Sequence, residues 1–155
     1  MTPFVLIHSF FICVAFIVSF PILFGTKGTK RHKLLGWIFT SSMLVSVIAT
    51  FFIPSFGHFS PIHLLSVLVL FWLINGVLAA RFKKGNWRYT HAMSMGSAYI
   101  AIIIAGIGVL VRYSFTPVNY INGYIASGIT ALIVIPLMVQ RIKKYKIVHL
   151  SFPPA

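Results

Sequence analysis

Five long apolar runs are the feature that most constrains the fold of this chain. Each run is long enough to cross a bilayer core of about 30 Å as a helix. The composition agrees, since 59% of the 155 residues are hydrophobic and 8% are charged, whereas about a quarter of a soluble domain is charged. The sequence predicts an all-α, polytopic protein with a four-helix bundle core, folded as one integral membrane domain over residues 1–155. The predicted spans cover residues 4–24, 34–53, 62–80, 89–111 and 123–139.

The charged side chains, all of them basic, predict how the chain is oriented. Twelve of the 13 lie in the loop between the first two spans, in the loop between the third and fourth spans, and in the C-terminal tail. Arg112 alone lies at the opposite face. Basic loops stay on the cytoplasmic side, so we expect the N-terminus outside and the C-terminus inside. Five crossings require the same orientation, and topology explains the positive charge without a nucleic-acid partner.

The sequence contains no Asp and no Glu, which excludes several kinds of active site. Ser-His-Asp triads, pairs of catalytic carboxylates and carboxylate proton relays all need an acidic side chain. Calcium and magnesium sites also depend on carboxylate oxygens. Cys13 is the only cysteine, so no internal disulfide is available. Imidazole is therefore the main group left for metal binding.

Four histidines fall at two depths on alternating spans. His8 and His63 lie toward the outer face, roughly 9–12 Å from the midplane of their spans at 1.5 Å per residue. His32 and His91 lie toward the inner face, roughly 13–16 Å from it. Alternate helices of a four-helix bundle face each other across its interior, where cofactors are often bound. We therefore expect two pairs, His8 with His63 and His32 with His91.

Each pair has the chemistry needed to ligate the iron of a haem b. Neutral imidazole is an iron ligand that needs no carboxylate nearby. Haem propionates are anions and favour basic neighbours, which Lys30, Arg31 and Arg88 supply at the inner face and Arg112 at the outer face. The predicted function is transmembrane electron transfer through one or two haems. The donor would be a quinol or a cytosolic reductant, and the acceptor a quinone, ferric iron or a partner protein.

Other interpretations of the same residues stay open. A histidine at a helix start is often only an interfacial polar residue. Small and aromatic residues on the spans suit close helix packing, so a homodimer or a non-enzymatic accessory subunit of a larger membrane complex is one alternative. A transporter or metal-binding protein is another, with His8, His58 and His63 as an outer site for zinc or copper.

Three motifs lie between the first and fourth spans: Lys27-Gly-Thr-Lys-Arg-His-Lys-Leu-Leu-Gly-Trp37, Gly57-His-Phe-Ser-Pro-Ile-His-Leu-Leu-Ser66, and His91-x3-Met95 followed by Tyr99 and Ala105-Gly106. These motifs resemble a family of small bacterial multi-pass membrane proteins of unknown function. The similarity extends from about Ile7 to Arg112 and implies that the chain lies in a bacterial cytoplasmic membrane.

The layout of helices and histidines is also similar to di-haem cytochromes b, the group that includes ascorbate-dependent transmembrane ferric reductases. This second resemblance implies that the two histidine pairs occupy the ligand positions. The chain departs from that group in its short length, in its lack of acids, and in the position of His32 at the very end of its helix.

Overall fold

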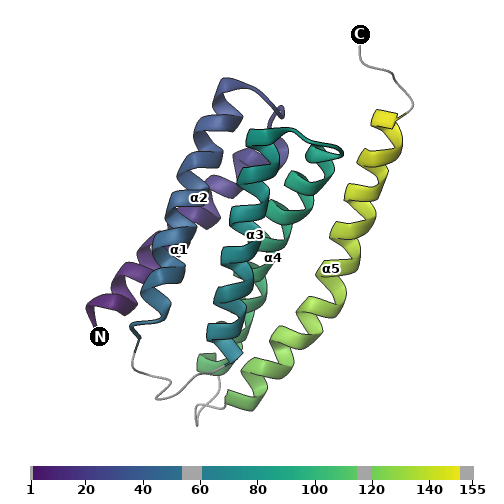
Figure 1. The fold of residues 1–155 in the computed structure, drawn as a ribbon. Helices are drawn as coiled ribbons and strands as arrows, with labels where there is room; N and C mark the ends of the chain where they lie inside the picture. Colours follow the sequence, from purple (N-terminus) through teal and green to yellow (C-terminus); the bar gives the residue numbers. More distant parts are fainter. Residues whose placement is uncertain (1, 54–60, 115–119, 151–155) are drawn as a thin grey trace. The chain divides into compact units, whose positions relative to one another are not determined.

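A computed structural model describes residues 2–53, 61–114 and 120–150 of the chain. In these ranges the structure is helical, with no strand, which confirms the all-α prediction. The five helices follow one another along the sequence (Figure 1). They are α1 (Pro3–Phe24), α2 (Lys30–Thr50), α3 (Pro61–Phe82), α4 (Trp87–Ser114) and α5 (Tyr120–Leu150).

All five helices are long enough and apolar enough to cross a membrane. Their large apolar side chains are widely exposed, for example Leu132 at 78% and Leu110 at 68%. A soluble protein would bury such residues, whereas a lipid bilayer solvates them. The chain is therefore a small multi-pass membrane protein. The predicted bundle core and the predicted positions of the termini stay predictions.

The helices extend beyond the predicted spans where polar residues can still form helical turns. Helix α2 begins at Lys30 instead of residue 34 because Thr29 caps it, its hydroxyl accepting a hydrogen bond from His32 N at 3.1 Å. Such a cap satisfies one of the backbone donors that a helix start leaves unpaired. Gly28, with a φ of +81°, lets the short α1–α2 connection turn. His32 consequently lies inside the first turn of α2.

The first compact unit comprises residues 1–73 and is built on the contact between α1 and α2. Small and polar side chains occupy much of its interior. Ala15 and Ser46 are fully buried, and Met43 is almost so. Small residues let two backbones approach closely within a membrane. Ser42, Ser46 and Thr50, four residues apart along α2, are all buried and therefore mark one interior face of that helix.

The second unit comprises residues 74–155 and is built on the contact between α4 and α5. A Cβ atom added at Gly123 would lie 2.8 Å from the carbonyl oxygen of Gly108, so the two backbones touch there. Further along the same contact, the Ser127 hydroxyl donates to Ile104 O at 3.1 Å. At the other end of this contact, a Cβ atom at Gly96 would lie 2.8 Å from the Met138 sulfur. Helix α5 thus packs along most of α4.

Candidate cofactor-binding site

His8 is held against helix α2 by hydrogen bonds to its Nδ1 atom. This ring nitrogen lies 3.0 Å from the carbonyl oxygen of Ser46, 3.0 Å from the Ser46 hydroxyl and 3.0 Å from the Thr50 hydroxyl. The ring is half-buried, and Ser46 and Thr50 are buried. Three polar contacts from one helix therefore fix the position of the imidazole inside an otherwise apolar segment.

The carbonyl oxygen of Ser46 assigns the tautomer of His8. Each hydroxyl carries a single proton. The Ser46 hydroxyl donates to His8 O at 3.2 Å, and the Thr50 hydroxyl donates to Ser46 O at 3.1 Å. The Ser46 carbonyl oxygen can only accept, so Nδ1 donates in its 3.0 Å contact with that oxygen. The hydrogen-bond network thus assigns the proton to Nδ1, and in the neutral ring the lone pair then lies on Nε2.

His63 lies near the same end of α2 as His8. Its side chain is buried, at 8% exposure, and its ring centroid is 5.6 Å from that of Phe51. Phe51 caps the C-terminus of α2 and directly follows Thr50, a partner of His8. The structure thus brings both predicted outer ligands to one end of α2, from α1 and from α3. Their pairing across a shared iron stays a prediction.

His91 repeats the main feature of His8 in the second unit. Its Nδ1 atom lies 2.9 Å from the backbone oxygen of Gly76 in α3. A carbonyl oxygen only accepts, so Nδ1 donates and Nε2 carries the lone pair of the neutral ring. One residue before Gly76, the Asn75 side chain donates to the Ser94 hydroxyl of α4 at 2.8 Å. A polar α3–α4 contact therefore positions the imidazole.

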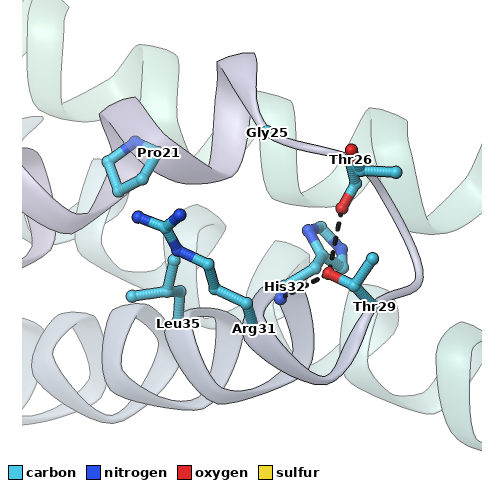
Figure 2. A pocket seen from close by; sticks show the side chains of 7 residues that line it. All are labelled: Pro21, Gly25, Thr26, Thr29, Arg31, His32 and Leu35. Carbon is cyan, nitrogen blue, oxygen red and sulfur yellow. Dashed lines mark hydrogen bonds between the residues drawn. The ribbon is translucent and has the colours of Figure 1, made fainter.

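His32 lies beside the loop that joins α1 to α2, where it lines a cavity together with Arg31 (Figure 2). His32 belongs to the first unit and His91 to the second, so their pairing stays a prediction.

Two of the predicted propionate partners contact aromatic rings. The Arg88 guanidinium lies 5.4 Å from the Trp87 ring centroid, and the Arg112 guanidinium lies 5.1 Å from the Tyr113 ring centroid. Lys30 is exposed.

A site built from three metal-ligating side chains is not found among the described residues. The predicted outer zinc or copper site needs His58, which lies outside the described residues. Cys13 is exposed on α1.

Sequence reasoning identified the histidines but missed the groups that orient them. Ser46 and Thr50 could have been found, because hydroxyls spaced four apart in an apolar helix mark one face. Gly76 acts through its backbone oxygen, and no side-chain pattern reveals such a partner.

Comparison with known proteins identifies no relative of this chain. No family model matches it, and neither a curated protein nor a solved structure does. The resemblance to a family of unknown function and the likeness to cytochromes b therefore rest on the quoted motifs and histidine layout alone.

Proposed function

We propose that the chain binds haem b in the membrane and transfers electrons across it, and that His8 and His63 would hold one haem. The observation that carries the proposal is the orientation of His8, whose Nδ1–H donates to Ser46 O at 3.0 Å and leaves the Nε2 lone pair for iron. Metal-ligating histidines almost always donate their other N–H in this way, often to a backbone carbonyl. The Nδ1–H of His91 likewise donates to a backbone carbonyl, that of Gly76.

The surrounding residues suit this role. Ser46 and Thr50 fix the ring plane of His8, while burial of His63 keeps its ring away from water. Bound haem would supply one-electron chemistry by alternating between ferric and ferrous iron. With no Asp or Glu and a single cysteine in the chain, the six histidines are its most numerous strong metal-ligating side chains. The basic face would attract an anionic electron donor.

Reconstituted vesicles test the proposed electron transfer. We expect vesicles that contain the haem-loaded protein and a trapped reductant to reduce external ferricyanide faster than protein-free vesicles. His8→Ala should lower the rate to that of protein-free vesicles, because the outer centre loses a ligand. His149→Ala, which removes a histidine assigned to neither centre, should leave the rate unchanged. If vesicles that contain the wild-type protein reduce ferricyanide no faster than protein-free vesicles, transmembrane electron transfer is excluded.

The orientation follows from the basic residues, of which twelve lie on one predicted side and Arg112 on the other. We propose that the N-terminus lies outside and the C-terminus in the cytoplasm of a bacterial cell. A peptide tag fused to the C-terminus should resist external protease in intact spheroplasts and be cleaved after lysis. Cleavage of the tag before lysis would reverse the orientation.

A further inference from the structure

A cavity of about 470 Å³ lies where α1 ends and α2 begins. Figure 2 shows the Arg31 side chain extending across it toward Pro21, with the His32 ring beside Thr26 and Thr29. The lining residues come from both helix ends and from the loop between them: Pro21, Gly25, Thr26, Thr29, Arg31, His32 and Leu35. The lining thus combines a guanidinium, an imidazole and two threonines with an apolar floor.

The positive charge around this cavity has no acidic counterpart in the protein. Lys30, Arg31 and Lys33 lie in the first turn of α2, where no acidic residue occurs, and the sequence contains no Asp or Glu. The start of a helix is the positive end of its dipole, so this dipole repels the cations there. An anion from outside the chain would offset both the repulsion among the cations and their repulsion by the helix dipole.

Lys27, the remaining cation of this loop, is already engaged. Its ammonium donates to Leu23 O at 2.7 Å and to Ile22 O, carbonyl oxygens at the end of α1. Burial lowers the pKa of this ammonium below its usual value. Lys27 therefore serves to cap α1, and Arg31 is the strong cation that faces the cavity.

The position of the cavity indicates where the anion comes from. Both spans that flank it end at this loop, so it lies at headgroup level once the helices cross a bilayer. Phe24, Leu34 and Trp37, on the two helix ends that form it, are 82%, 62% and 65% exposed and offer apolar surface for acyl chains. A planar guanidinium matches phosphate oxygens with two parallel hydrogen bonds.

We propose that this cavity binds the phosphate group of an anionic phospholipid, with Arg31 as the main contact. Native mass spectrometry of the detergent-solubilised protein, titrated with phosphatidylglycerol, measures the fraction that carries one lipid. Arg31→Gln should weaken this binding roughly tenfold, because the charge-assisted pair of hydrogen bonds is lost. Arg31→Lys should weaken it less, since the charge remains without the planar fork. The matched control Arg81→Gln removes another exposed helix-end arginine that does not line the cavity and should have no effect.

Inorganic phosphate distinguishes two sources of the same anion. If millimolar phosphate does not displace the lipid, the headgroup and acyl chains are both held, as proposed. Displacement by phosphate alone would overturn a lipid source in favour of a free phosphate ion. Equal losses from Arg31→Gln and Arg81→Gln would overturn the site itself, because binding would then follow net charge.

Haem content, measured in the same preparations, separates this site from the proposed haem centre. A phosphate site predicts that Arg31→Gln weakens lipid binding to the same extent in haem-free and in haem-loaded protein. A fall in haem content together with lipid binding would assign Arg31 to a haem propionate and overturn the phospholipid proposal. If the wild-type protein binds lipid but no haem, and Arg31→Gln loses the lipid, the phospholipid site is supported even though the proposed function has failed.

Discussion

Substituting His63 with alanine is expected to remove at least about half of the haem, because one of the two predicted haem sites would then lack one of the two imidazoles that would hold it. The remaining fraction would belong to a second centre at His32 and His91. His63 is buried and its ring contacts Phe51, beside the Thr50 hydroxyl that holds His8. With a small residue in its place, only the His8 imidazole would remain to hold a haem at that end of α2. Haem per polypeptide, determined by extraction from purified protein, measures the effect.

Two controls make the His63 result specific. His149→Ala removes a histidine that belongs to neither centre and should retain full haem content. His63→Met keeps a large side chain with a sulfur ligand, so partial retention of haem with an altered spectrum would indicate direct ligation. If His63→Ala protein elutes as a single species and carries wild-type haem content, His63 is not a ligand.

Adding one methyl group at Gly108 is expected to destabilise the α4–α5 contact by about 1–3 kcal/mol, the usual cost of overpacking a tight interface. The new Cβ atom would lie 2.1 Å from the Ser127 hydroxyl oxygen and 3.0 Å from Gly123 O. The hydroxyl can rotate, but the carbonyl oxygen belongs to the α5 backbone, so the helices must separate. In Gly123→Ala the new Cβ atom would lie 2.8 Å from Gly108 O, so this variant should be destabilised to a similar extent. Thermal unfolding in detergent should show a lower midpoint for both variants.

The matched controls lie on the same two helices. Gly106 in α4 and Gly128 in α5 have no atom within 4 Å of an added Cβ. Alanine at either position should leave stability unchanged or raise it by up to about 1 kcal/mol, since alanine favours helix more than glycine. If all four variants unfold at the same temperature, the close approach of α4 and α5 at Gly108 is wrong.

The sequence was sufficient to predict the helices because bilayer thickness sets the length of each apolar run. It was less informative about where helices end. The basic segment at Lys30 looks like a loop by hydropathy, yet Thr29 caps it into α2. The predicted fifth span likewise ends at residue 139, whereas α5 continues to Leu150 through a basic segment. Backbone hydrogen bonding, unlike hydropathy, does not stop where the chain becomes polar.

The depths of His8 and His63 could also be predicted, but the surroundings of the candidate ligands could not. Depth along a helix follows from residue number, and this placed His8 and His63 at one level. The carbonyl oxygens of Ser46 and Gly76 that accept from His8 and His91 depend on which helix faces which. Such contacts arise from tertiary packing and leave no mark on residue type.

The reduced-minus-oxidised absorption spectrum of protein purified from haem-sufficient cells tests the haem assignment most directly. Bis-imidazole ligation predicts the sharp bands of a low-spin haem b, weakened in His8→Ala and in His63→Ala. A featureless difference spectrum from well-folded wild-type protein would contradict the assignment.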